Sequence, residues 1–435
     1  MLTFSTPGAC QPGLAGFGPD GAAAAPPFTT STPAGASLDL QFAGTGALDP
    51  RITFTRASSA SYFDATGTLQ SAGSNVARFD YNPTTLAPRG LLIEEARTNS
   101  IRNSTMAGAV PGTPGTLPTN WAIATMPPGT MATQVIGTGT EGGISYVDVR
   151  LYGTATGAGQ LNIQIDNPTA SPGQIWTASM YCRLVGGSTT NVSMVFLQLN
   201  DSTPPAGVIG FTPIAAALVS QRSPPATTRA LAAGTTRLYA YFGIQSAGAG
   251  AVDLTVRIGA PQLELGVFAT SFIPTTGAAA TRAADVATMP TGSWFNPAAM
   301  CLALEATMLQ ATGAGNEFWV SLDDGTANNR LSLLTAVNAS TVSSLVSSGG
   351  VNSVLGGNVY TVSPPATFKY AIQVASGNYA SCAGGVVASQ AATQPVGVNR
   401  LALGTGGGGP VTGYLRRVRY WPRALGATEL QAVTR

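Results

Sequence analysis

Apolar and polar residues alternate along most of the chain after residue 36, with the period of two that is typical of β-strands. In the longest run one face carries Val252, Leu254, Val256 and Ile258. Four further segments alternate in the same way, at residues 161–166, 300–306, 318–322 and 368–374. This pattern predicts antiparallel strands with one buried face, and therefore pairs of sheets that pack face to face.

Changes in composition and turn chemistry divide the pattern into four segments. Residues 1–36 are rich in Ala, Gly, Pro, Ser and Thr and predict an extended arm. Residues 37–99 predict a small β module that contains a hairpin turn at residues 64–67, and residues 100–283 and 284–435 predict one sandwich each. The fold class is therefore all-β, with tandem antiparallel β-sandwiches. Only residues 426–433 predict a helix, with Thr428 near its start.

Composition agrees with short strands joined by loops and excludes two kinds of partner. The 435 residues include 53 Gly and 30 Pro, too many for long helices, while 44% are hydrophobic and only 9% charged. The net charge of +2 is too small to attract nucleic-acid backbones, so no nucleic acid is expected. The most apolar stretch, residues 208–219, is too short to cross a bilayer, so we expect a soluble protein without membrane insertion.

The residue types present exclude the commonest catalytic groups. The chain has no histidine, which removes the usual general base, metal ligand and pH switch. Its cysteines are widely spaced and predict buried side chains without a disulfide framework or zinc site: Cys10, Cys182, Cys301 and Cys382. Glu94 and Glu95 are adjacent, so in a strand they point to opposite faces and cannot act as an acid and base pair.

Other carboxylates could form a catalytic pair only if the fold brings them together, and a surface or edge-strand position is the alternative for each. They are Glu141, Asp148, Asp166, Glu264 and Glu305. We therefore expect no enzyme of a histidine-, cysteine- or metal-dependent kind.

Three parts of the sequence resemble known families. Residues 56–63 (RASSASYF), 79–81 (FDY) and 90–99 (GLLIEEARTN) resemble an adaptor-like module of tail fibre proteins from tailed phages and prophages of proteobacteria. Residues 100–283, which end near IGAPQLELG at 258–266, look like the β-sandwich of carbohydrate-binding modules. Residues 284–435 resemble the concanavalin-like, laminin-G-like jelly roll, through segments at residues 382–389, 400–404 and 413–422.

The resemblance implies jelly-roll sandwiches and a non-catalytic virion protein of the tail fibre or spike type that attaches to host-surface glycans. It implies a place on the phage particle surface, at tail or capsid, after assembly in the host cytoplasm. The arm would contact other virion proteins, and the chain would form a homo-oligomer, commonly a trimer. No cofactor is required, although the jelly-roll family often carries calcium. A purely structural or decorating fibre without glycan binding, and a polysaccharide depolymerase, remain as alternatives.

The best candidate site in the sequence is the segment 319–330, where carboxylates and amides follow an aromatic residue. Its candidate carbohydrate-binding residues are Trp319, Asp323, Asp324 and Asn329. Oxygen ligands also suit calcium, so Asp323 and Asp324 are a weak calcium candidate. The alternative is a β-turn in which Asp and Asn bond to their own loop.

Two further predictions concern aromatic and basic residues. Trp121 and Trp294 lie in loop-like contexts and are candidate sugar platforms, whereas Trp176 and Trp421 lie in or beside strands and predict core packing. Arginines at one strand near the C-terminus predict a solvated strand edge, with the first on one face and the other two opposite: Arg416, Arg417 and Arg419.

Overall fold

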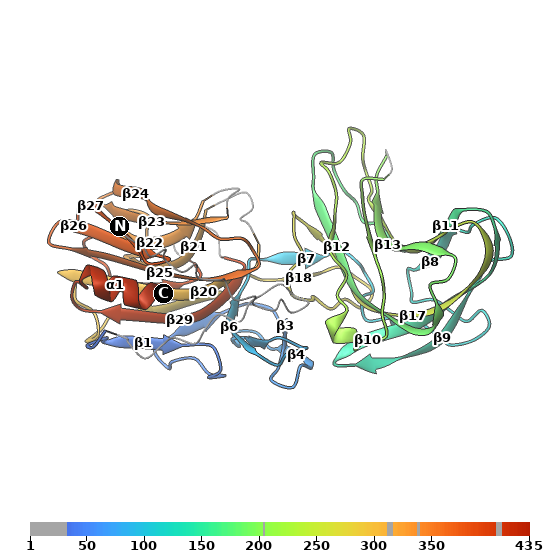
Figure 1. The fold of residues 1–435 in the computed structure, drawn as a ribbon, viewed down its shortest axis with the longest axis horizontal. Helices are drawn as coiled ribbons and strands as arrows, with labels where there is room; N and C mark the ends of the chain where they lie inside the picture. The colour runs from blue at the N-terminus through green and yellow to red at the C-terminus, as the bar shows by residue number, and fades with distance from the viewer. Residues whose placement is uncertain (1–32, 203–204, 311–315, 337–339, 406–410) are drawn as a thin grey trace, which may run out of the picture.

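The computed structural model describes residues 33–202, 205–310, 316–336, 340–405 and 411–435, so Cys10 and most of the predicted arm lie outside the described residues. The described part contains twenty-nine strands, one short 3-10 helix and one α-helix, which confirms the all-β prediction. Two sandwiches lie side by side (Figure 1). No helix in these ranges is long and apolar enough to span a membrane.

The C-terminal sandwich consists of an eight-stranded and a seven-stranded sheet. The eight-stranded sheet runs β27 (Val386–Ala391), β26 (Asn378–Ala383), β25 (Ala366–Ala375), β20 (Ala299–Met308), β29 (Gly413–Trp421), β6 (Pro88–Ile93) and β5 (Phe79–Tyr81), and β1 (Leu38–Gln41) also pairs with β29. The facing sheet runs β2 (Thr53–Thr55), β19 (Val286–Pro290), β28 (Arg400–Leu403), β21 (Glu317–Asp323), β22 (Arg330–Thr335), β23 (Thr341–Ser348) and β24 (Val351–Thr361). Alternate apolar residues from both sheets form one core between them.

The single α-helix, α1 (Ala427–Thr434), covers the outer face of the eight-stranded sheet, as predicted for residues 426–433. Leu430 and Val433 pack there against Trp421 in a small second core. The N-cap residue is Gly426, whose N–H donates to a carboxylate oxygen of Glu429 at 2.9 Å. Thr428 therefore lies inside the first turn, close to its predicted position.

The middle sandwich consists of two five-stranded sheets built from one continuous stretch of chain. One sheet runs β15 (Ala226–Thr227), β12 (Trp176–Ser188), β17 (Ala249–Leu265), β10 (Ile144–Thr156) and β9 (Ala132–Glu141). The other runs β14 (Gly207–Phe211), β13 (Val192–Asn200), β16 (Tyr239–Ser246), β11 (Gly159–Asp166) and β8 (Ala122–Thr125), and η1 (Leu218–Ser220) lies in a connection. The apolar face predicted for residues 252–258 is buried in the core between the sheets.

Residues 37–99 do not form a sheet system of their own, which differs from the separate module that we predicted. Strand β1 pairs with β29 from Leu38 opposite Tyr420, β6 pairs with β29, and β2 pairs with β19. Strands of three to six residues bury too little apolar surface to stand alone, so they complete the larger sheets. Strands β3 (Ala60–Phe63) and β4 (Leu69–Ala72) form a separate two-stranded sheet around the predicted turn. Between the sandwiches, β7 (Arg97–Asn99) pairs with β18 (Ala280–Arg282) (Figure 1).

The prediction of a solvated edge at the C-terminal arginines is wrong. Strand β29 is interior, with β20 on one side and β1 and β6 on the other, and Arg419 is only 1% exposed. Burial, with Arg417 nearby, lowers the pKa of Arg419 to about 10. A bulge beside Glu305 changes the alternation, and Arg416 donates to Glu305, the residue opposite Arg417. Strands β1 and β6, from the N-terminal part of the sequence, pair with β29, so β29 is not an edge strand.

Candidate functional site

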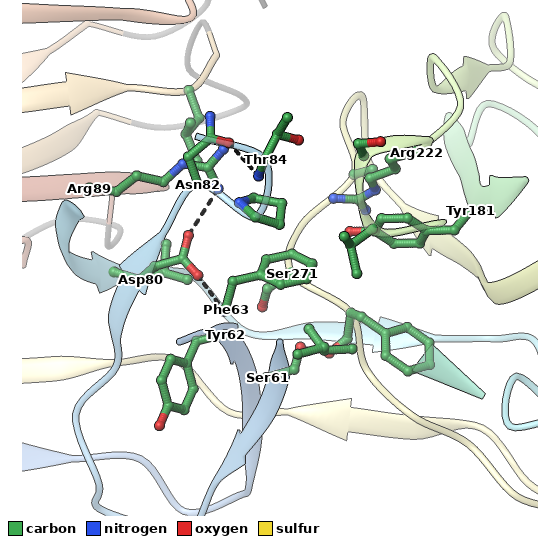
Figure 2. A pocket seen from close by; sticks show the side chains of 18 of the residues that line it. Ser61, Tyr62, Phe63, Asp80, Asn82, Thr84, Arg89, Tyr181, Arg222 and Ser271 are labelled. Carbon is green, nitrogen blue, oxygen red and sulfur yellow. Dashed lines mark hydrogen bonds and ion pairs between the residues drawn. The ribbon is translucent and has the colours of Figure 1, made fainter. Parts of the chain in front are cut away.

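A cleft of about 810 Å³ opens where the two sandwiches and the N-terminal strands meet, and we call it the interdomain cleft (Figure 2). One wall comes from β3, β5 and the loop that follows β5. The opposite wall comes from Tyr181 of β12 and from residues 214–222. Residues 269–272 line its floor, and the C-terminal sandwich contributes Gln310, Pro365 and Tyr414.

Asp80 organises the first wall of the cleft. Its Oδ1 accepts from the Phe63 N–H at 2.6 Å, and its Oδ2 accepts from the Tyr414 hydroxyl at 2.6 Å and from Arg89 Nη1 at 3.0 Å. Burial, together with the charge of Asp80, holds the pKa of Tyr414 well above its usual value, so its hydroxyl stays a donor at neutral pH. Asp80 thus joins β3, β5 and β29 at one point.

Arg222 and Tyr181 form the opposite wall (Figure 2). Arg222 Nη2 donates to the Thr270 carbonyl at 2.7 Å and to Ser179 Oγ at 3.0 Å, and its guanidinium carbon lies 5.9 Å from the Tyr181 ring centre. Arg222 is exposed, and its hydrogen-bond partners among the described residues are neutral oxygen atoms, while its charge also acts on the buried Glu264 carboxylate. The cleft therefore presents a guanidinium held in place by neutral partners.

The β3–β4 hairpin docks on the middle sandwich beside the cleft. The rings of Phe63 and Tyr181 meet edge to face with centroids 6.5 Å apart, and the Leu69 N–H donates to the Gly142 carbonyl at 2.8 Å. Gly143 has φ +82°, and a Cβ there would lie 2.2 Å from the Leu69 carbonyl oxygen. Only glycine allows the two backbones to approach this closely.

Beneath the floor lies a set of five buried charged residues, which we call the buried ion network: Arg56, Arg78, Arg282, Glu94 and Asp285. Asp285 accepts from Arg78 at 2.5 Å and from Arg56 at 3.0 Å, while Glu94 accepts from Arg78 at 2.7 Å. Arg282 Nη1 lies 3.0 Å from Glu94. The network connects the N-terminal strands to the segment that leads back from the middle sandwich.

Glu94 is the member of this network that also lines the cleft. Burial alone would raise the pKa of Glu94, but the guanidinium groups of Arg282 and Arg78 outweigh it and lower the pKa to about 2. Ser271 adds an N–H bond of 2.8 Å and a hydroxyl bond of 2.6 Å to the same carboxylate. Glu94 is therefore an ionised structural acceptor at neutral pH.

The candidate tryptophans lie in the cores, contrary to the prediction that their rings are sugar platforms. Trp319 is fully buried, donates to Thr335 Oγ1 at 2.7 Å and meets the Phe368 ring edge to face. Trp294 packs in the same core and Trp121 in the core of the middle sandwich. Large aromatic rings contribute most when buried, which explains these positions. The core packing predicted for Trp176 and Trp421 is confirmed.

The loop after β21 matches the turn alternative. Asp324 Oδ1 accepts from the Thr326 N–H at 2.8 Å, and its Oδ2 accepts from Asn329 Nδ2 at 2.8 Å. Asp323 is buried and accepts from Arg400 Nε at 2.5 Å, whereas Asp324 is half-buried and bonds within its own loop. The described residues contain no group of three or more His, Cys, Asp or Glu side chains that could hold a metal ion.

The other predicted residues are also tied to local partners. Burial of the thiols confirms the prediction for the cysteines within the described ranges, Cys182, Cys301 and Cys382. Glu141 and Asp148 converge on Arg257, at 2.6 and 2.8 Å. Asp166 pairs with Arg102, Glu305 with Arg416, and Glu264 accepts from Thr270. None of these five carboxylates lines the interdomain cleft.

Sequence reasoning missed both the cleft and the buried ion network. The cleft joins segments hundreds of residues apart, which no local pattern shows. Arginine is ordinarily a surface residue, so Arg56, Arg78 and Arg282 drew no attention. One indication was present, because Arg56, Asp80 and Glu94 all lie in the three segments that carry the tail fibre resemblance.

No protein-family model matches the sequence, and no curated protein matches it. Among solved structures, the chain is similar to the CBM40 of the Ruminococcus gnavus IT-sialidase bound to α2,3 sialyllactose. The identity is 19%, over 31% of this chain and 82% of that chain, with a TM-score of 0.27. The structure titled with the CBM40 alone covers 32% and 84% at 19% identity and a TM-score of 0.25. The form bound to α2,6 sialyllactose covers 32% and 83%, at 18% identity and a TM-score of 0.25.

Proposed function

We propose that this chain is a non-catalytic glycan-binding protein and that the interdomain cleft holds the sugar. The observation that carries the proposal is the cleft itself, whose volume of about 810 Å³ falls in the range of about 300–1,000 Å³ usual for ligand sites. Its walls combine aromatic rings with hydroxyl, amide and guanidinium groups. Sugars are bound by such combinations, because rings pack on C–H groups while polar side chains bond to hydroxyls.

The charged groups of the cleft support a binding role over a catalytic one. Hydrolysis of a glycosidic bond needs a carboxylic acid that keeps its proton and a second carboxylate beside it. Glu94, with its pKa lowered to about 2, is ionised at neutral pH. Asp80 accepts hydrogen bonds from Phe63, Arg89 and Tyr414. Both carboxylates are engaged in holding the walls together, which disfavours the depolymerase alternative.

A glycan array probed with the full chain tests this proposal. We expect binding to a defined set of glycans, and Arg222→Ala to weaken it about tenfold because a charged hydrogen bond to the ligand is lost. Arg237→Ala is the matched control, since Arg237 is an exposed arginine of the same sandwich outside the cleft. If the protein binds no glycan on the array, the purely structural alternative is favoured. Shortening of a polysaccharide by the protein favours the depolymerase.

The finer proposal is that this binding attaches a phage particle to its host. It rests on the tail fibre resemblance of residues 56–63, 79–81 and 90–99. The chain would then be a tail fibre or spike subunit on the particle surface, joined to other virion proteins through residues 1–36. Antibody labelling of intact particles tests the location, and light scattering tests the expected trimer. A cellular location or a monomer at all concentrations contradicts this part of the proposal.

A further inference from the structure

The charged side chains that line the interdomain cleft differ in how far their charges are compensated. Arg89 pairs with Asp80 at 3.0 Å, and Glu94 pairs with two arginines of the buried ion network. The hydrogen bonds of Arg222 in the described structure go to a carbonyl and a hydroxyl oxygen instead. These neutral partners fix the position of Arg222 and leave its positive charge in the cleft.

The buried ion network adds positive charge beneath the floor of the cleft. Its members are three arginines and two carboxylates, so the positive charges exceed the negative ones by one. Glu94 belongs to the network and also lines the cleft, so this excess lies next to the ligand space. Buried charges are weakly screened, and a cleft with low-dielectric walls focuses their field. The network and Arg222 therefore attract ligand charge of the same sign.

Glu264 is a further carboxylate whose charge acts on Arg222 and Arg282. It is fully buried and accepts from the Thr270 N–H at 2.9 Å, while the Thr270 carbonyl accepts from Arg222. Burial raises the pKa of Glu264, which disfavours its ionised form. Even with Glu264 ionised, the arginines of this region exceed its carboxylates by one. They are Arg56, Arg78, Arg89, Arg222 and Arg282, against Asp80, Glu94, Asp285 and Glu264.

Arg222 also keeps donors for a ligand. Its Nη2 donates to the Thr270 carbonyl and to Ser179 Oγ, whereas within the described ranges Nε and Nη1 form no hydrogen bond. The residue is exposed and lines the cleft (Figure 2). A planar guanidinium matches the oxygens of a carboxylate or phosphate, and such charged hydrogen bonds are about twice as strong as neutral ones.

The surroundings of Arg222 suit the uncharged part of a sugar. Ile214 is 52% exposed and lines the same wall as Arg222, and the half-buried Tyr62 lines the facing wall. Apolar and aromatic surfaces pack on the C–H groups of sugar rings. The cleft thus combines a surface for the ring with a guanidinium for an anionic substituent.

From the excess of positive charge and the available donors of Arg222, we infer that the sugar in the interdomain cleft is acidic, with its carboxylate or phosphate group against Arg222. This inference rests on the proposed function, because it names the class of glycan that the cleft holds. A neutral sugar would bond to the same donors without the attraction between opposite charges.

Matched forms of the same polysaccharide test the charge of the ligand. The full chain is applied to an array in which each acidic polysaccharide stands beside its carboxyl-reduced form and its dephosphorylated form. We expect binding to a subset of the untreated polysaccharides, and loss of the anionic group to weaken it about tenfold because a charged hydrogen bond is lost. Carboxyl reduction has this effect if the group is a carboxylate, and dephosphorylation if it is a phosphate.

Variants of Arg222 test where the anionic group lies. Arg222→Gln should bind the untreated and treated forms equally, because the charge that distinguishes them is gone. Arg222→Lys should keep part of the preference, since it keeps a positive charge without the planar donor group. Arg237→Gln is the matched control, because Arg237 is exposed, donates to a carbonyl oxygen at 3.0 Å and lies outside the cleft. It should keep the preference of the wild type.

The outcomes separate this inference from the proposed function. Equal binding of untreated and treated polysaccharides by the wild type overturns the inference and leaves glycan binding standing. A preference for the acidic forms that persists in Arg222→Gln also overturns it, since Arg222 then only supports the floor of the cleft. If no polysaccharide on this array or glycan on the first binds, the proposed function fails and the inference fails with it.

Discussion

The two sandwiches differ in how the chain builds them. Every strand of the middle sandwich comes from residues 122–265, whereas the C-terminal sandwich combines strands from residues 38–93 with strands from residues 286–421. In its eight-stranded sheet β29 lies between β20, from the same C-terminal part of the chain, and the strands β1 and β6, from the N-terminal part. The middle sandwich is thus inserted into the C-terminal sandwich, which we call the split sandwich. Only the split sandwich depends on strands from distant parts of the chain.

The largest effect on thermal unfolding is expected when the two sandwiches are produced as separate fragments. A fragment of residues 97–283 should unfold cooperatively on heating, because its sheets and core are complete. A fragment of residues 284–435 should show no cooperative transition, since Leu415, Val418 and Tyr420 lose the strands that cover their side of the sheet. Circular dichroism during heating measures both. Cooperative unfolding of the C-terminal fragment alone would contradict the dependence on residues 38–93.

The second prediction concerns the buried ion network, which joins the N-terminal strands to the segment that leads back from the inserted sandwich. Asp285→Asn removes the charge that faces Arg56 and Arg78 and should lower the free energy of unfolding by about 3–5 kcal/mol, the usual cost of breaking a buried pair. Urea denaturation measures it. Asp253→Asn is the control, because its pair with Arg150 has a similar distance of 2.7 Å but is exposed, and little change is expected. Equal effects would show that burial is not the cause.

The third prediction is a loss of stability in acid. The pKa of Glu94 falls from 4.5 to about 2 on folding, so the folded state binds the proton less tightly than the unfolded chain. This contribution is fully present above about pH 4.5 and is lost as the pH falls toward 2. Glu94→Gln should flatten the decline in unfolding free energy between these values. Parallel curves for the variant and the wild type would exclude Glu94 as its source.

The smallest effect is expected where the hairpin β3–β4 meets the middle sandwich. Gly143→Ala places a Cβ 2.2 Å from the Leu69 carbonyl oxygen at a positive φ, and should cost about 1–3 kcal/mol. Gly173→Ala is matched for φ, at +79°, but a Cβ there meets nothing within 4 Å. The difference in melting temperature between the two variants isolates the close approach from the backbone strain. Equal melting temperatures would show that the hairpin can shift at no cost.

Local alternation predicted the fold class because it depends only on neighbouring residues. The buried face at residues 252–258 and the short C-terminal helix follow from such spacing. Strands from residues 37–99 join the sheets of the C-terminal sandwich, and local spacing could not predict this pairing. Pairing of Leu38 with Tyr420 leaves no trace in either local sequence, and an arginine-rich strand such as β29 is normally an edge.

The candidate site was harder to predict than the fold. Trp319 and Trp294 were chosen for their ring type, yet ring type alone does not separate a core position from a sugar platform. Asp323 and Asp324 were chosen as neighbouring carboxylates, and the fold turns one to Arg400 and the other to its own loop. The cleft residues Asp80, Arg89 and Arg222 come together only through tertiary packing.

The insertion of one sandwich into the other has a mechanical consequence. A chain pulled at residue 33 and at its C-terminus passes tension from β1 into β29 through the backbone ladder that joins Leu38–Gln41 to residues 417–420. Both crossings to the middle sandwich run side by side through β7 and β18, so the inserted domain is not in the line of force. Tension therefore passes through the split sandwich and leaves the inserted one unloaded.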